Sequence, residues 1–270
     1  MKEQRELLDA KKIIEAIPPQ SRSYLSRLDI FCSIDSTNTY LLLQGKQQPN
    51  QRESGWVCLA EQQTQGRGRQ GKEWFSPYAT NIYCSLTWAF PTAFPGLSAL
   101  SLVCGVLLIQ MLKGLGIEGA LGLKWPNDVL FSGRKLAGIL LETRVSAQQN
   151  WVVIGLGLNH ALPQDQNPAW IGVEEILGKA LSRNRAIGLL LDELFQGLVL
   201  FEAKGLKPFL PAIREHDLLL QKEVVIQTPQ RWVTGLAQGL SEDGDLLLLD
   251  EEGKHHRFCY GEASVRLKPS

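Results

Sequence analysis

The chain is 270 residues long, with 44% hydrophobic and 21% charged residues, and its 28 basic side chains balance 28 acidic ones. This length is enough for one large and one small domain with well-buried cores. The lack of a basic excess argues against a dedicated DNA-binding protein. Five scattered cysteines without a C-x-x-C pair favour reduced thiols in a cytoplasmic protein.

Residues 5–16 have the apolar spacing of a helix that ends before Pro18, and we expect residues 1–30 to form an N-terminal connector region. They contain no apolar signal core. The polar run 36–39 predicts a capped helix start. The apolar run 97–115 is shorter than the ~20 residues of a membrane span, so we expect a buried helix and no membrane association.

Three segments alternate or concentrate apolar residues like strands, namely 55–61, 82–88 and 151–158. Residues 129–142 read as a hairpin around a three-residue glycine loop. Helical spacing from Ile187 predicts a helix that Gly205 ends. Strands, a hairpin and long helices together predict an α+β domain over residues 31–216.

After residue 217 the pattern changes to short strands near 223–227, 231–237, 245–250, 255–260 and 263–268. Asp-Gly and Glu-Gly pairs mark the turns between them. We therefore expect residues 217–270 to form a small all-β unit, an open barrel.

The loop from Gln63 to Pro77 is the most informative segment. Residues 66–72 combine three cations with three glycines, which offers bare backbone N–H groups and guanidinium donors to an anion. The spacing matches G-x-x-x-x-G-K, but Glu73 replaces the required Ser or Thr, and Pro77 prevents a following helix. We therefore interpret it as an anion-binding loop other than a nucleotide P-loop. An RNA-binding Gly/Arg segment and a solvated surface loop remain alternatives.

Two further segments carry opposite charges close together. Lys124 and Asp128 flank an X-Pro turn, where Asp128 could hold Mg²⁺ and Lys124 could meet phosphate, or both could form a surface ion pair. Lys135 opens the second arm of the hairpin. It either extends to water or points into a pocket to neutralise a carboxylate.

Gly155 and Gly157 lie on one face of a predicted strand, which leaves that face without side chains. The bare face either receives a flat ligand or marks a bulge or close crossing. Trp170, in a polar loop, either caps the core or stacks on a flat ring. Together these features suit a ligand with a polyphosphate, a carboxylate and a flat uncharged body, and they indicate activation of a carboxylic acid by ATP.

Five segments in this order make the chain resemble bacterial biotin–protein ligases: Asp35-Ser36-Thr37-Asn38, 61–77, 124–128, 134–140 and 155–159. The resemblance implies a mixed-sheet catalytic domain of the biotin/lipoate ligase type, followed by an SH3-like C-terminal domain. It implies ATP and Mg²⁺ as cofactors and biotin as the substrate. Biotin would be activated as biotinyl-5′-AMP and transferred to a lysine of a biotin carboxyl carrier protein.

The resemblance also assigns residues by position. Lys135 would contact the biotin carboxylate as a catalytic residue, and catalytic Arg69 would fold over the adenylate. The biotin-binding residues would be Ser36, Thr37, Asn38, Gln63, Arg67, Gly68, Arg69, Trp74, Lys135, Gly155 and Gly157. The ATP-binding residues would be Arg67, Arg69, Lys72, Lys124, Asn159 and Trp170, with Asp128 at the metal.

A lipoate or octanoate ligase of related fold is the alternative. Its substrates lack a urea ring, so the polar cluster around Ser36 and Gln63 would remain unpaired. Gln70 and Lys72 stand where some family members carry arginine. Only about 30 residues precede Asp35, too few for the winged-helix domain of regulatory members, so we expect no DNA binding. A homodimer stays open.

Overall fold

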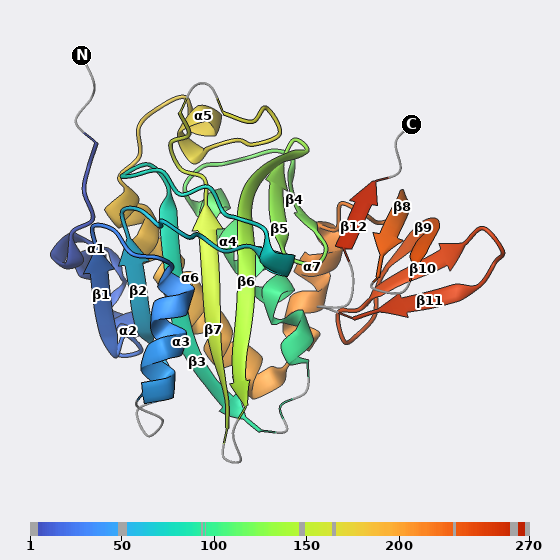
Figure 1. Cartoon of the computed structure of the whole chain (residues 1–270), viewed down its shortest axis with the longest axis horizontal. Helices are drawn as coiled ribbons and strands as arrows, with labels where there is room; N and C mark the ends of the chain where they lie inside the picture. Colours follow the sequence, from blue (N-terminus) through green and yellow to red (C-terminus); the bar gives the residue numbers. More distant parts are fainter. Residues whose placement is uncertain are drawn as a thin grey trace.

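The computed structural model describes residues 5–47, 53–92, 94, 96–145, 149–163, 166–228, 231–259 and 264–267. They form a larger unit around a seven-stranded sheet and a smaller unit around a five-stranded sheet. The two units lie side by side in Figure 1. None of the five cysteines is joined in a disulfide.

The large sheet has the strand order β1-β2-β3-β7-β6-β5-β4. Strand β1 pairs with β2 in parallel, and the other described neighbours are antiparallel, so the predicted α+β architecture with a mixed sheet is confirmed. The strands are β1 (Arg27–Phe31), β2 (Trp56–Ala60), β3 (Ile82–Pro91), β4 (Leu121–Lys124), β5 (Asp128–Phe131), β6 (Arg134–Val145) and β7 (Gln149–Leu158).

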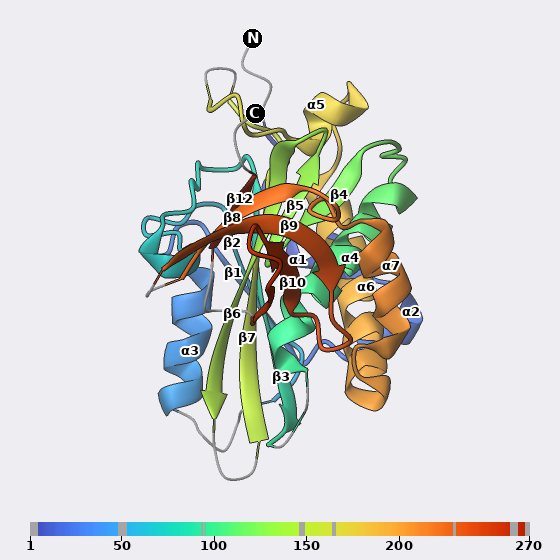
Figure 2. The same ribbon diagram turned by 90° about the vertical axis from the view of Figure 1, so that its right-hand side faces the viewer.

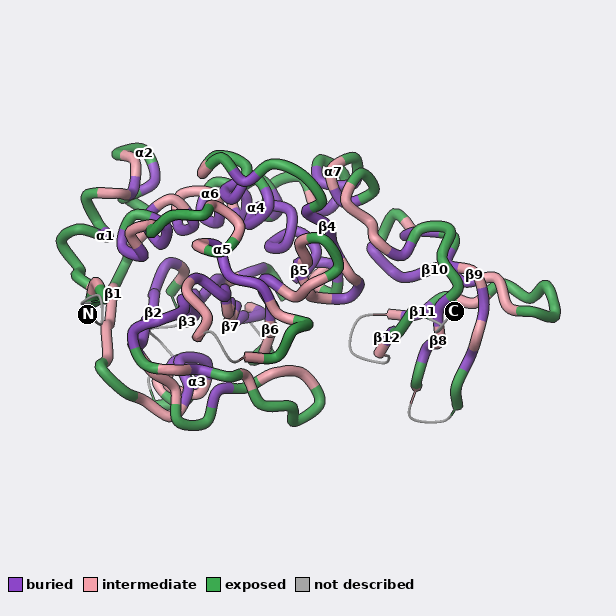
Figure 3. Tube along the Cα trace, turned by 90° about the horizontal axis from the view of Figure 1, so that it is seen from above, coloured by how far each residue is buried: buried purple, intermediate pink, exposed green. Residues whose placement is uncertain are grey.

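Helices cover both faces of this sheet, as Figures 2 and 3 show. Helix α3 (Thr37–Gln47) packs on one face against β2, β3 and β7. The opposite face carries α4 (Leu100–Gly114) and α6 (Arg183–Lys204), with α1 (Ala10–Ala16) packed on α6. The remaining helical segments are α2 (Pro19–Arg22), η2 (Arg69–Gly71), η3 (Leu97–Ala99), α5 (Val173–Leu177), η4 (Lys207–Phe209) and α7 (Leu210–Glu215).

Helix α4 with the preceding η3 is the predicted core helix. Within the described residues, Leu97–Gly114 is the one helical segment long and apolar enough to cross a membrane. However, 72% of that segment is buried inside the molecule, as for the central helix of a packed core. Gly105 and Gly197 lie where α4 meets β4 and α6, since a Cβ on either would come within 2.6 Å of a leucine side chain.

The small sheet is antiparallel, with the order β11-β10-β9-β8-β12. Its strands are β8 (Glu223–Gln227), β9 (Trp232–Leu240), β10 (Leu246–Asp250), β11 (His255–Phe258) and β12 (Ser264–Leu267). They confirm the predicted C-terminal β unit, although residues 260–263 and 268 of the expected strands lie outside the described residues. The boundaries 1–30, 31–216 and 217–270 stay predictions.

The segment that joins the larger and the smaller unit is hydrogen-bonded to the large sheet. The backbone N–H of Leu123 in β4 donates to the carbonyl of His216, and Leu218 donates back to the carbonyl of Leu123. The indole N–H of Trp125 donates to the carbonyl of Gly244 in the small unit at 3.2 Å. These bonds hold the small sheet beside the β4–β5 end of the large one.

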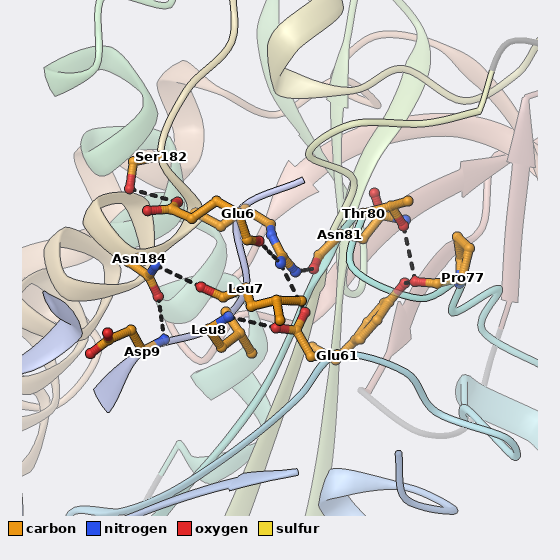
Figure 4. Close-up of polar contacts among 12 residues, drawn as sticks. Glu6, Leu7, Leu8, Asp9, Glu61, Pro77, Thr80, Asn81, Ser182 and Asn184 are labelled. Atoms are coloured by element: carbon orange, nitrogen blue, oxygen red, sulfur yellow. Dashed lines mark hydrogen bonds and ion pairs between the residues drawn. The ribbon is translucent and has the colours of Figure 1, made fainter. Parts of the chain in front are cut away.

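The prediction of a helix from residue 5 was wrong for residues 5–9, which are extended before α1. Asp9 caps the helix by accepting from the N–H of Lys12. The backbone before it bonds to buried side chains instead, because Asn184 bonds to both Leu7 and Asp9, and Leu8 donates to Glu61 (Figure 4). These long-range partners satisfy backbone groups that a helix would otherwise satisfy locally.

Candidate active site

A cleft of about 250 Å³ opens between the 63–77 loop, the strands β6 and β7, the β4–β5 turn and strand β12. It gathers side chains that are widely separated in the sequence. The predicted site residues that line it are Thr37, Gln63, Arg67, Gly68, Arg69, Lys72, Trp74, Lys124, Asp128, Lys135 and Gly157.

The 63–77 loop is a short hairpin arm. The N–H of Gly68 donates to the carbonyl of Lys72 at 2.7 Å, and the N–H of Trp74 donates to the carbonyl of Gly66 at 2.9 Å. A Cβ at Gly66 would lie 2.4 Å from the Trp74 carbonyl oxygen, so the close approach requires glycine. No helix follows Lys72 in the described chain, in agreement with the exclusion of a P-loop. The arm presents Arg67, Arg69 and Lys72 to the cleft.

The face of β7 that the glycines leave bare is covered by side chains of this chain. A Cβ at Gly157 would lie 2.4 Å from the indole of Trp74, and one at Gly155 would lie 2.2 Å from the Asn38 amide. Strand β7 pairs with β3 and β6 through both glycines without a register shift, so there is no bulge here. The flat group on this face is the Trp74 indole. Its buried N–H has no hydrogen-bond partner among the described residues.

Lys135 points into the cleft and not away from it. Its Nζ lies 2.7 Å from Oδ1 of Asp128 and 5.2 Å from the centre of the Trp74 ring. Strands β5 and β6 are neighbours, which brings these two residues together across the hairpin. Of the two alternatives for Lys135, the structure selects the one that neutralises a carboxylate.

Lys124 lies at the end of β4, next to the same carboxylate. Burial lowers the pKa of Lys124, and the charge of Asp128 opposes that shift. The charges of Lys135, Lys72 and Arg266 lower the pKa of Lys124 further. The cleft therefore concentrates positive charge, which an anionic ligand would relieve.

A buried chain of hydroxyl and amide groups lies beside the cleft. Both the N–H and the hydroxyl of Thr37 donate to Oε1 of Gln63, at 2.9 and 3.1 Å. The Gln63 Nε2 donates to Ser76. Ser85 Oγ lies 2.7 Å from Thr37 Oγ1 and 2.6 Å from Asn38 Oδ1. These groups offer neutral donors and acceptors to a polar uncharged ring.

Five predicted residues do not line the cleft. Ser36 and Asn38 are buried at the start of α3, and Gly155 lies under the Asn38 amide. Asn159 donates to the backbone carbonyl of Lys135 at 3.0 Å. The Trp170 ring stacks on Phe75 with centroids 5.8 Å apart. Asn159 thus supports the backbone that carries Lys135, and the adenine platform at Trp170 stays a prediction.

Sequence reasoning missed four groups of residues at this site. Ser85 sits on the polar side of the alternating strand β3, but α3 covers that side and Ser85 is buried. Asn127 accepts from Arg69 at 3.4 Å. Glu142 bonds to both Asn38 and Arg67. Residues 264–266 of β12 line the cleft from the small sheet. Of these residues, only Glu142 could have been singled out from the sequence, because its charged side chain stands beside apolar neighbours.

Comparisons with known proteins agree with this geometry. The model of the biotin/lipoate A/B protein ligase family matches residues 30–159, and that of the biotin protein ligase C terminal domain matches residues 219–266. The bifunctional ligase/repressor BirA of Escherichia coli is 35% identical over 266 residues, covering 97% of this chain and 79% of that protein. The chain therefore belongs to the biotin/lipoate A/B protein ligase family.

Within that family, the similar proteins are biotin ligases. The biotin–[acetyl-CoA-carboxylase] ligase of Mycobacterium tuberculosis is 31% identical, with 82% of this chain and 83% of that protein aligned. The solved biotin protein ligase from Aquifex aeolicus in complex with biotin and ATP has a TM-score of 0.76 and 30% identity. That match covers 90% of this chain and all of the other.

Proposed function

We propose that this chain is a biotin–protein ligase. It activates biotin with ATP as biotinyl-5′-AMP and then transfers biotin to a lysine of a biotin carboxyl carrier protein. The observation that carries the proposal is the single cleft in which Lys135, Asp128 and the cationic arm meet beside a polar neutral pocket. The similarity to a ligase solved with biotin and ATP supports it.

The neutral pocket fits the urea ring of biotin. Thr37 and Gln63 line the cleft, and Ser85 and Asn38 lie directly behind them. A urea has two N–H donors and one carbonyl acceptor, so it pairs with uncharged amides and hydroxyls. Lipoate and octanoate have no such groups, so they could not use the hydrogen-bonding capacity that these side chains retain beyond their bonds to one another.

The charged end of the cleft fits the reacting groups. A biotin carboxylate oxygen attacks the α-phosphorus of ATP, and pyrophosphate leaves. Lys135 stabilises the carboxylate and the charge that develops at phosphorus. The cations that line the cleft and would face the phosphates are Arg67, Arg69, Lys72, Lys124 and Arg266. In the second step the amine of the carrier lysine attacks the adenylate carbonyl, and AMP leaves.

Mg²⁺ belongs to this proposal through Asp128. The described residues contain no group of three or more His, Cys, Asp or Glu side chains suited to a metal. Nucleotide-bound Mg²⁺ needs only one or two protein carboxylates, because phosphate oxygens and waters complete its shell. Asp128 can supply one such carboxylate, which the ion would share with Lys135, 2.7 Å from Oδ1, and the bound ion would neutralise phosphate charge.

The adenylate is hydrolysed if water reaches it, so the cleft has to close over it. The 66–72 arm is the element placed to do so, and we expect it to become more protected from proteolysis when biotin is bound. DNA binding is not part of the proposed function. Homodimer formation and a cytoplasmic location are further proposals, testable by sedimentation and by fractionation.

The decisive experiment is incubation of the protein with biotin, MgATP and a biotin carboxyl carrier domain, followed by a streptavidin blot. We expect biotin on the carrier and none when ATP or the target lysine is removed. Adenylation assays with biotin against lipoate and octanoate separate the two branches of the family. Activation of lipoate in preference to biotin would overturn the proposal.

A further inference from the structure

Glu142 lies toward the end of β6, outside the cleft lining, yet its carboxylate bonds to two residues of the proposed biotin site. Oε2 accepts from Nδ2 of Asn38 at 2.9 Å, and Oε1 lies 3.1 Å from Nη1 of Arg67. One carboxylate therefore joins helix α3, strand β6 and the cationic arm. We propose that Glu142 is a positioning residue that orients the hydrogen bonds of the biotin pocket and holds the arm against the sheet.

The orientation follows from the chemistry of the carboxylate. An ionised carboxylate only accepts hydrogen bonds, so the amide of Asn38 has to turn its NH₂ group toward Glu142. The oxygen of the same amide then faces Ser85, whose Oγ lies 2.6 Å away and donates to it. The Asn38 NH₂ group also lies 3.5 Å from the Leu140 carbonyl, so Glu142 at 2.9 Å makes the shorter of the two contacts that orient this amide.

This choice passes along the buried chain to the cleft. Ser85 has a single hydroxyl proton, so once it donates to Asn38 it cannot also donate to Thr37, whose Oγ1 lies 2.7 Å away. The Thr37 hydroxyl then turns its one proton from Oε1 of Gln63, 3.1 Å away, toward the oxygen of Ser85, and Oε1 retains the backbone N–H of Thr37 as its donor. That oxygen keeps a lone pair for a ligand. A urea N–H is the donor that such an acceptor recognises.

The second contact acts on the arm. Arg67 is 47% exposed and Glu142 is 21% exposed, so the ion pair contributes little to folding stability. It does fix the base of the arm to β6, next to the pocket whose hydrogen bonds Glu142 orients. The Glu142 carboxylate thus acts both on the hydrogen bonds of the pocket and on the 66–72 arm, which a residue with a purely structural role would not do.

The inference rests on the proposed biotin function and is tested by binding. Biotin affinity is measured by calorimetry for the unchanged protein, for Glu142→Gln and for Glu118→Gln. The last removes the same charge from an exposed site outside the cleft. We expect Glu142→Gln to weaken biotin binding about tenfold or more, with its melting temperature nearly unchanged. Glu118→Gln should bind like the unchanged protein.

A swap separates orientation from general damage. Asn38→Asp alone sets two carboxylates against each other and should weaken biotin binding. In Asn38→Asp combined with Glu142→Gln, the amide stands on β6 and the carboxylate on α3, where it still accepts from Ser85. We expect the swap to recover most of the affinity lost in either single variant.

Two results would overturn the inference. One is a Glu142→Gln protein that binds biotin within twofold of the unchanged chain, and the other is a swap that binds no better than Asn38→Asp alone. Failure of the unchanged protein to bind biotin would be a different outcome, because it would overturn the proposed function as well.

Discussion

The carboxylate of Glu61 and the guanidinium of Arg183 lie 2.8 Å apart, and each side chain is only 4% exposed. Glu61 follows β2 at the base of the 63–77 loop, and its carbonyl accepts from Ala79 at the other end of that loop. Arg183 also donates to the carbonyls of Glu6 and Asn81. Figure 4 shows the extended N-terminal segment beside Glu61 and Asn81. The pair thus connects the N-terminal segment, α6 and the base of the loop.

Removal of Arg183 should therefore be strongly destabilising. Arg183→Met leaves the Glu61 carboxylate buried without a counter-charge, and we expect a loss of about 3–5 kcal/mol in unfolding free energy. Urea denaturation measures it. Combining Arg183→Met with Glu61→Gln removes the buried charge and should recover part of the loss. A double variant no more stable than Arg183→Met would mean that the charge is not the cause.

Lys135→Ala should abolish biotin adenylation. The Nζ group is the cation nearest Asp128 and faces the proposed position of the biotin carboxylate. Loss of one electrostatic stabiliser of a transition state typically costs about 10²–10³-fold in rate. Biotin-dependent exchange of pyrophosphate into ATP measures the first step alone. Lys179→Ala, an exposed lysine elsewhere, is the control, and equal exchange rates in the two variants would contradict the role.

Gly157→Ala should damage the site, whereas Gly114→Ala should not. A methyl group at Gly157 would lie 2.4 Å from the Trp74 indole and force it to move, at a cost of about 1–3 kcal/mol, and should reduce adenylation. Nothing lies within 4 Å of a Cβ at Gly114, in the last turn of α4. There alanine should stabilise the helix by about 0.5–1 kcal/mol. Thermal melts and adenylation rates of the two variants check both statements.

His160 should make the protein less stable in mild acid. Its side chain is 1% exposed, and burial, with a smaller contribution from Arg183, lowers the pKa of His160 to about 4 from 6.5. Glu6 opposes that shift. The unfolded chain binds the proton below pH 6.5, and the folded chain only near pH 4. Stability is therefore unaffected above pH 6.5 and falls between these values, by at most roughly 3 kcal/mol.

The check compares unfolding free energy at pH 7 and pH 4.5 in the unchanged protein and in His160→Leu. Neither ring nitrogen of His160 has a hydrogen-bond partner in the part of the chain described, so leucine removes no bond. We expect a smaller loss of stability in the variant. Parallel pH profiles for the two proteins would assign the acid sensitivity to other groups.

Arg266→Glu should weaken ATP binding more than biotin binding. Arg266 lines the cleft from strand β12, and its charge acts on Lys124 at the phosphate end. Reversal of a cation that faces a polyphosphate should raise the KM for ATP about tenfold or more, with the KM for biotin little changed. Lys254→Glu, at an exposed turn of the same sheet, is the matched charge reversal. Equal ATP KM values in the two variants would count against this role.

Local patterns in the sequence predicted the parts of the fold that depend on neighbours along the chain. The alternation in β3, the helical spacing in α6 and the glycine loop between β5 and β6 each identify an element from its own residues. The hairpin also places Lys135 near Asp128, because paired strands bring such residues together. These elements, and the position of Lys135 on the hairpin, were therefore predictable.

The remaining features depend on contacts between distant segments. Ser85 is buried only because α3 covers its side of β3. Glu142 acts only through its contacts with Asn38, more than a hundred residues away in the sequence, and with Arg67, 75 residues away. Arg266 comes from the other sheet. Residues 5–9 were misjudged for the same reason, since their backbone partners come from Glu61 and from α6. The periodicity of a short stretch of sequence cannot reveal contacts between segments that are far apart along the chain.

The indole of Trp74 lies directly on Gly157, so a side chain of the protein covers the strand face that the two glycines leave open. A ligand that binds on this face has to displace the Trp74 side chain, which is part of the chain and therefore always present. The measured affinity of such a ligand is therefore the difference between its own contacts with this face and those of Trp74. We expect a variant with a smaller side chain at position 74 to bind its ligand more tightly but to close over it less well.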